Sequence, residues 1–168
     1  MTTRSRQLAT SLALAVGIAS FTATTARAQT LGQATVPPLM LADAQKMIDA
    51  AQKAAADLNL RLSIAVVDGR GDLIAVSRMP GAGAATPDTA IGKAMLSTLM
   101  GRPSAAMVGM ANTPFVQAYN DATGGRLRFL QGAVPIVRNG VVIGAIAGSG
   151  ATSQQDEDAA NVGLKALP

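Results

Sequence analysis

The stretch from Gln131 to Asn161, QGAVPIVRNGVVIGAIAGSGATSQQDEDAAN, constrains the fold more than any other part of the chain. Val134 to Val137 and Val141 to Ile146 are runs rich in β-branched residues, which favour strands. Asn139-Gly140 stands between them, and this dipeptide tolerates the positive φ angles of a two-residue hairpin turn. We therefore predict two paired antiparallel strands.

A glycine-rich corner follows the second of these strands. Gly148, Ser149 and Gly150 let the backbone turn with no steric penalty from a Cβ atom. Thr152 or Ser153 is placed to cap a helix whose first turn is acidic. Because helix N-termini bind anions readily, the backbone amides of this corner form a candidate ligand-binding site.

The first 28 residues have the pattern of a secretory signal peptide. Arg4 and Arg6 give a positive start, and an apolar run from Leu8 to Phe21 follows. Ala26-Arg27-Ala28 then resembles a small-residue cleavage site. The run of about 14 apolar-rich residues is shorter than the ~20 needed to span a bilayer. We expect cleavage after residue 28, no membrane insertion of the mature protein, and a periplasmic or secreted location.

Composition restricts the possible function classes. Without the three arginines of the leader, the 14 basic residues fall to 11 against 10 acidic ones, so the mature chain is nearly neutral. With one tyrosine and three phenylalanines in the whole sequence, few aromatic rings are available to stack on bases. We expect no nucleic-acid binding.

The sequence contains no cysteine and no histidine. Disulfides, thiolate metal sites and histidine-dependent catalysis are therefore excluded. An enzyme would have to use Asp68, Lys93 or Glu157 as acid or base, and no paired constellation of such residues supports a reaction. We therefore expect a protein without strong catalytic machinery, and an enzyme that uses one of these three residues stays an open alternative.

Periodicity and turn residues predict one domain over residues 39–168, preceded by a flexible lead-in over residues 29–38. Asn112-Thr113-Pro114 predicts a break in the chain. The sheet should be largely antiparallel with helices packed on its faces, an α+β fold of the α/β sandwich type. The expected elements are helices over 41–58, 86–100, 104–110 and 153–167, strands over 62–67, 73–76, 134–137 and 141–146, and an edge strand over 126–130.

Two cations stand out as candidate ligand-binding residues. Lys93 lies in mid-helix among apolar residues, and Arg102 directly precedes a proline at a helix end. Either could face an anionic ligand or pair with a carboxylate, and Lys93 could instead lay its stem along an apolar surface.

The sequence offers few candidate metal ligands. Tyr119 is the only tyrosine, and a phenolate is one of the known ligands of haem iron, although a lone tyrosine also serves in packing. The thioethers of Met79, Met107 and Met110 are further candidates, although methionines readily fill cores. Asp156-Glu157-Asp158 is either an oxygen-donor metal site or an acidic helix start that interacts with the helix dipole.

Several short motifs follow one another in a specific order: Ser63 to Asp68, Ser77 to Ala82, Lys93, Gly101 to Ser104, Gly132 to Pro135, Asn139-Gly140, Gly144 to Gly150, and Gln155 to Glu157. Together they resemble the family of GlcG and HbpS, which is related to the C-terminal domain of PduO-type proteins. The resemblance spans about residues 39–167. It implies a five-stranded, mostly antiparallel sheet with helices on its faces, and assembly into a homo-oligomer.

The resemblance also implies association with haem, including in an extracellular sensor accessory of a two-component system. In haem-binding relatives the iron ligand is histidine in some and another side chain elsewhere. We therefore expect an exported, oligomeric haem- or tetrapyrrole-binding protein that sequesters haem or serves a sensor kinase or another extracytoplasmic partner. Two alternatives stay open: a pocket for a small organic anion lined by Lys93, Arg102 and the corner amides, and an assembly or signalling partner without a ligand.

Overall fold

The computed structural model describes residues 37–167. The predicted signal peptide and residues 29–36 of the predicted lead-in lie outside the described residues. Within residues 37–167, no helix is both long and apolar enough to cross a membrane. The elements are α1 (Leu41–Asp57), β1 (Ser63–Asp68), β2 (Leu73–Arg78), α2 (Thr86–Met100), the 3-10 helix η1 (Ser104–Met110), α3 (Pro114–Ala122), β3 (Ala133–Arg138), β4 (Val141–Ser149) and α4 (Ser153–Lys165).

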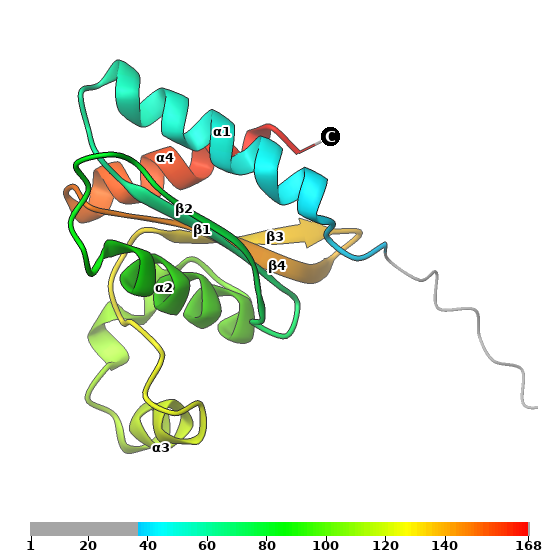
Figure 1. The fold of residues 1–168 in the computed structure, drawn as a ribbon. Coiled ribbons are helices and arrows are strands. Elements are labelled where there is room, and N and C mark those ends of the chain that lie inside the picture. The colour runs from blue at the N-terminus through cyan, green and yellow to red at the C-terminus, as the bar shows by residue number, and fades with distance from the viewer. Residues whose placement is uncertain (1–36, 168) are drawn as a thin grey trace, which may run out of the picture. The chain divides into compact units, whose positions relative to one another are not determined.

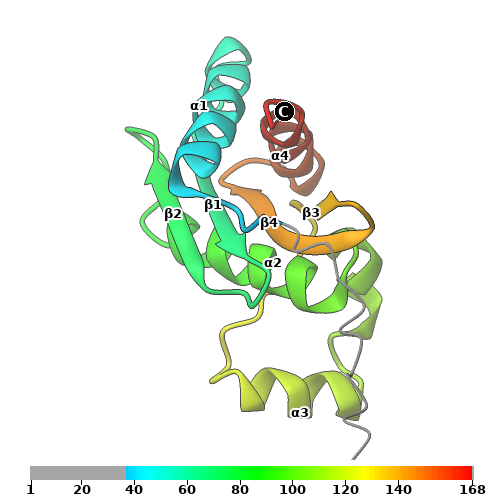
Figure 2. The ribbon, with the colours of Figure 1, turned by 90° about the vertical axis from the view of Figure 1, so that its right-hand side faces the viewer.

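The sheet has the strand order β2-β1-β4-β3, and every neighbouring pair is antiparallel (Figure 2). β3 and β4 form the predicted hairpin, and Asn139 and Gly140 have φ angles of 52° and 77° in its turn. The two hairpins join through β1 and β4, where Ser63 lies opposite Ser149. Hairpin pairing therefore gives the antiparallel sheet that the sequence predicted.

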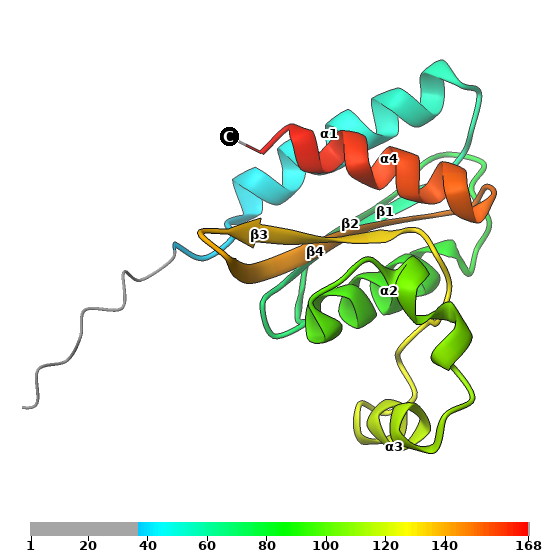
Figure 3. The ribbon, with the colours of Figure 1, turned by 180° about the vertical axis from the view of Figure 1, so that it is seen from behind.

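Helices cover both faces of the sheet: α1 and α4 lie on one face, and α2 lies on the other (Figures 1 and 3). Successive side chains of a strand point to opposite faces, so the two faces can differ in size. The face toward α1 and α4 carries large side chains such as Ile64, Ile136 and Ile146. The face toward α2 carries small ones, including Ala145 and Ala147. Small residues let α2 pack close to the sheet.

The predicted strand over residues 126–130 is wrong, so the sheet has four strands rather than five. This segment crosses α2 instead. The Arg128 N–H donates to the Gly92 carbonyl at 3.2 Å, and a Cβ atom on Gly92 would overlap with the Arg126 carbonyl. Leu127 is buried in the core beside α2. The segment predicted as an edge strand therefore packs against a helix.

Residues 101–131, which we call the arm, run from the end of α2 to the start of β3 and contain η1 and α3. α3 stands apart from the sheet, beyond α2 (Figures 1 and 2). The predicted break at Asn112-Thr113-Pro114 is the start of this helix. Pro114 occupies the first helical turn, where its missing N–H has no intrahelical partner to lose.

Candidate functional site

The glycine corner after β4 contains a buried ion pair. Lys93 of α2 reaches Asp156 in the first turn of α4, with 2.8 Å between Nζ and Oδ2 and side chains 3% and 4% exposed. Nζ also donates to the Gly148 carbonyl at 3.1 Å, and the Ala151 N–H donates to Asp156 Oδ1 at 3.0 Å. The pair thus connects helices that pack on opposite faces of the sheet.

Two glycines make room for this pair. Gly132 has a φ angle of +134°, and a Cβ atom there would lie 2.7 Å from Lys93 Nζ and 3.0 Å from the Gly148 carbonyl. A Cβ atom on Gly148 would meet the main chain of Asp156. Only hydrogen atoms at these two positions allow the lysine to pass the end of the sheet.

The first turn of α4 is capped from within the protein. Thr152 Oγ1 accepts from the Gln155 N–H at 3.3 Å, and Gln155 Oε1 accepts from the Thr152 N–H at 3.2 Å, which is a capping box. Thr152, rather than Ser153, is therefore the cap. Gly148 and Ser149 are buried, whereas Gly150 and Ser153 are exposed. The corner uses Lys93 and most of its own amides for structure, which leaves few groups for an anion.

The acidic run of α4 serves separate roles. Asp156 is paired with Lys93, while Asp158 is exposed and accepts from Gln154 Nε2 at 2.9 Å. No group of three acidic side chains within residues 37–167 is arranged to hold a metal ion. Of the two alternatives for this run, the structure favours an acidic helix start.

Arg102, a predicted ligand-binding residue, lies on the arm, and it is not among the hydrogen-bond partners of Lys93. Its backbone is fixed by Ser97, whose Oγ donates to the Arg102 carbonyl at 2.8 Å. Arg102 and Arg126, near the two ends of the arm, are both exposed. Among the described residues, neither guanidinium has a hydrogen bond or an ion pair. Both are available to an anion.

Tyr119, the predicted haem ligand, lies on α3. Its ring is half-buried against the core beside α2 and stacks on Phe115, with 6.3 Å between ring centroids and 23° between planes. Phe115 is 69% exposed. The Tyr119 hydroxyl has no hydrogen-bond partner among the described residues, and it is not among their enclosed polar atoms. An exposed aromatic face therefore adjoins a free phenol oxygen.

The surface of the arm is both apolar and cationic. It contains three arginines and one aspartate. Four large apolar side chains of the arm are between 38% and 69% exposed: Val108, Met110, Phe115 and Leu130. Such a surface suits a ligand that is apolar over most of its area and carries acidic groups at its edge.

Two of the three methionines predicted as candidate iron ligands pack in or against the cores. The Leu62 N–H donates to Met79 Sδ at 3.4 Å, and this methionine packs beside α1. Met107 is 3% exposed in the core beside α2. Met110 of η1, by contrast, is exposed on the arm.

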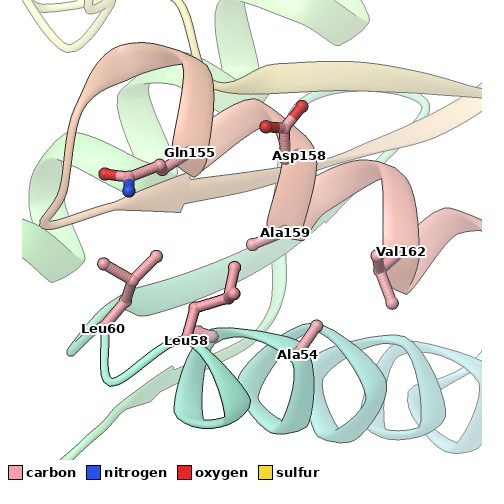
Figure 4. Close-up of a pocket in the computed structure, with 8 residues that line it drawn as sticks. Ala54, Leu58, Leu60, Gln155, Asp158, Ala159 and Val162 are labelled. Carbon is pink, nitrogen blue, oxygen red and sulfur yellow. The ribbon is translucent and has the colours of Figure 1, made fainter.

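A pocket of about 70 Å³ lies between the C-terminal end of α1 and α4 (Figure 4). Leu58 and Leu60 face Ala159 and Val162 across it. Sites for small organic ligands typically enclose about 300–1,000 Å³. This pocket is therefore too small for a tetrapyrrole.

Sequence analysis did not single out Phe115, Arg126 or the Lys93–Asp156 pairing. A usable signal for Phe115 was present, because it precedes Tyr119 by four residues and such residues share one face of a helix. The spacing was missed because the sequence at Asn112-Thr113-Pro114 predicted a break in the chain rather than the start of a helix. Lys93 and its partner Asp156 are 63 positions apart, so no local sequence pattern predicts that they pair.

The fold and the site define a small α+β sandwich domain with an antiparallel sheet between two helical layers and an aromatic, cationic arm. The chain belongs to the HbpS-like family: the family model described as haem degrading protein HbpS-like matches residues 39–165. This match confirms the predicted resemblance.

Individual relatives agree with the family assignment. An uncharacterized 15.0 kDa protein from the dhaT-dhaS intergenic region of Citrobacter freundii is 29% identical over 131 residues, covering 77% of this chain and 92% of the relative. Klebsiella pneumoniae protein ORFY has a TM-score of 0.72 and 26% identity, covering 79% of this chain and 92% of its own. A double mutant of Streptomyces reticuli HbpS has a TM-score of 0.70 and 26% identity, covering 96% and 99%.

A crystal structure of a PduOC:Heme complex has the same fold. Its TM-score is 0.69 at 23% identity, covering 78% of this chain and 96% of that chain. These solved structures therefore share the fold of this chain.

Proposed function

We propose that this protein is an exported, oligomeric protein that binds haem or a related tetrapyrrole on its arm. The family assignment supports a haem-related role. The observation that carries the proposal is the free Tyr119 hydroxyl beside the exposed ring of Phe115. No other described part of the chain combines an iron donor with an open aromatic surface.

The residues of the arm fit the chemistry of haem. In a chain without histidine and cysteine, a phenolate is the strongest iron donor that remains. Phe115 and the other exposed apolar residues of the arm offer apolar surface for the macrocycle, and Arg102 and Arg126 offer guanidinium groups for the two propionates. Bound haem would supply one-electron and oxygen chemistry. The chain's own residues bind and orient the ligand.

Oligomer formation and export belong to the same proposal. A ligand seated on the exposed arm has one face uncovered, and a second copy of the chain would cover that face. The leader-like sequence supports export, and the exported protein would sequester haem or report it to a sensor kinase. The description of the family as haem degrading concerns the family, and our proposal for this chain is binding.

Hemin titration of the mature protein tests the proposal. We expect a saturable change of the Soret band for the wild type and about tenfold weaker binding for Tyr119→Phe, equivalent to about 1.4 kcal/mol. Leu58→Ala, which removes an exposed apolar side chain far from the arm in sequence, is the matched control for non-specific adsorption and should bind as the wild type does. A wild type without saturable binding would refute the proposal.

A further inference from the structure

We infer that the arm discriminates between oxidation states of the bound metal, so that it holds ferric haem and releases ferrous haem. This inference rests on the proposed function, because it concerns the same site. It follows from the iron donors that the arm contains and from those that it lacks.

The arm has two kinds of iron donor. The sequence contains one tyrosine, no histidine and no cysteine, so the oxygen of Tyr119 is the only strong donor on the arm. Met107 is buried in the core beside α2 and cannot reach a surface ligand without local unfolding. The thioether of Met110 is exposed and is the only soft donor that the arm presents at its surface.

A phenolate and a thioether prefer different oxidation states. A phenolate is a hard anionic ligand, and its attraction to iron weakens when reduction removes one positive charge from the metal. A thioether is soft and neutral, and methionine ligation of haem favours the reduced state. If Tyr119 holds the iron, reduction weakens the complex. If Met110 holds it, reduction does not.

The other contacts of the arm do not depend on the oxidation state. Arg102 and Arg126 would bind propionates, whose charge is the same in ferric and ferrous haem. Phe115 and Leu130 are exposed and would contact the macrocycle through apolar surface, which reduction of the iron leaves unchanged. These contacts contribute equally to both states, so the difference in affinity arises at Tyr119.

Porphyrins with redox-inert metals test the effect of metal charge on affinity without a reduction step. We would measure the affinities of Ga(III)-, Zn(II)- and metal-free protoporphyrin for the full mature protein, Tyr119→Phe and Met110→Leu. We expect Ga(III)-protoporphyrin to bind the wild type as hemin does and to bind Tyr119→Phe about tenfold more weakly. Zn(II)- and metal-free protoporphyrin should bind the wild type and Tyr119→Phe equally and weakly. Met110→Leu should match the wild type with every ligand.

Reduction gives a second readout with haem itself. Dithionite added to the wild-type hemin complex should accelerate transfer of haem to apomyoglobin, and Tyr119→Phe should transfer at the same rate before and after reduction. An unchanged unfolding midpoint of Tyr119→Phe shows that the variant is folded.

The outcomes distinguish this inference from the proposed function. Zn(II)-protoporphyrin bound as tightly as Ga(III)-protoporphyrin, or ferrous binding lost in Met110→Leu, would overturn the inference while leaving haem binding intact. A wild type that binds neither hemin nor Ga(III)-protoporphyrin would overturn the proposed function, and the inference with it.

Discussion

Lys93 and Asp156 are buried together, and each charge is stabilised inside the protein by the other. Moving an ammonium or a carboxylate out of water is costly, and the loss is offset only by close pairing and further hydrogen bonds. The Gly148 carbonyl and the Ala151 N–H supply those bonds. The pair therefore fixes α2 and α4 relative to the sheet rather than recognising a ligand.

Removing one partner should be severe. Asp156→Asn leaves the ammonium of Lys93 buried without its counter-charge, and we expect a loss of about 3–5 kcal/mol in the free energy of unfolding, measured by urea denaturation. Asp158 lies two residues further along the same helix and is exposed. Asp158→Asn should therefore change the free energy of unfolding by less than about 0.5 kcal/mol. The double variant Lys93→Met, Asp156→Leu should be more stable than Asp156→Asn. Equal stabilities for the Asp156 and Asp158 variants would contradict this interpretation.

Gly132 should be intolerant of any side chain. In Gly132→Ala the φ angle of +134° strains an L-residue by about 1–3 kcal/mol, and the new methyl group also meets Lys93 and the Gly148 carbonyl. Gly140→Ala has a comparable strain from its φ angle of +77° but nothing within 4 Å of the new Cβ. We expect the melting temperature to fall further for Gly132→Ala. An equal fall in melting temperature for the two variants would show that contact with Lys93 does not destabilise Gly132→Ala.

The sequence identified Lys93 and the glycine corner separately but could not connect them. A lysine among apolar residues indicates only that its charge needs a partner, because many distant carboxylates satisfy that need equally well. The partner is set by how α2 and α4 pack on the sheet, which is tertiary information. Tyr119 is a candidate from the sequence because it is the only tyrosine and because a phenolate can ligate haem iron, whereas its exposed neighbour Phe115 depends on the position of α3.

At the scale of elements, the sequence predicted those with strong local signals and failed where tertiary packing decides. The β3–β4 hairpin, α1 and α4 follow from turn residues, helical spacing and a cap. Residues 126–130 alternate as a strand would, yet their backbone finds partners outside the sheet: the Leu127 N–H donates to Asn120 Oδ1 at 2.9 Å, and the Arg128 N–H donates to Gly92. Gly92 makes this crossing possible, and its role is invisible without the structure.

The crossing of the arm over α2 can be disrupted selectively. Gly92→Ala places a methyl group against the Arg126 carbonyl and the Arg128 side chain, so we expect amide exchange at Arg128 to accelerate and the free energy of unfolding to fall by about 2 kcal/mol. Gly109→Ala in η1 meets nothing within 4 Å and should change neither quantity. Protection at Arg128 that survives in Gly92→Ala would show that the arm is held by other contacts.

For the whole molecule, the arm is the proposed ligand-binding segment, and it is attached to a closely packed sandwich. Ser104 fixes one of its contacts, because its buried Oγ accepts from the Ala133 N–H at 3.0 Å where β3 begins. Arg128 fixes another through Gly92. Binding residues on a mobile segment gain affinity when a rigid scaffold holds them in place. The geometry of the arm should therefore influence hemin affinity from a distance.

Ser104→Ala tests this connection. The substitution leaves the buried Ala133 N–H without a partner, which costs about 1–3 kcal/mol, and it releases one end of the arm. We expect faster limited proteolysis within residues 101–131 and a several-fold weaker hemin affinity. Ser153→Ala, on the exposed corner of α4, is the control and should change neither. If Ser104→Ala speeds proteolysis of the arm but leaves hemin affinity unchanged, hemin binding does not depend on the order of the arm.

The central claim is that hemin binds the arm through Tyr119, and paramagnetic broadening of amide signals tests it most directly. Spectra of the mature protein would be recorded with hemin and with diamagnetic Ga(III)-protoporphyrin as the reference. We predict selective loss of amide signals around Phe115 and Tyr119 with hemin, while signals around Leu58 and Val162 at the α1–α4 pocket persist. Broadening centred on that pocket, or spread evenly over the domain, would contradict the account.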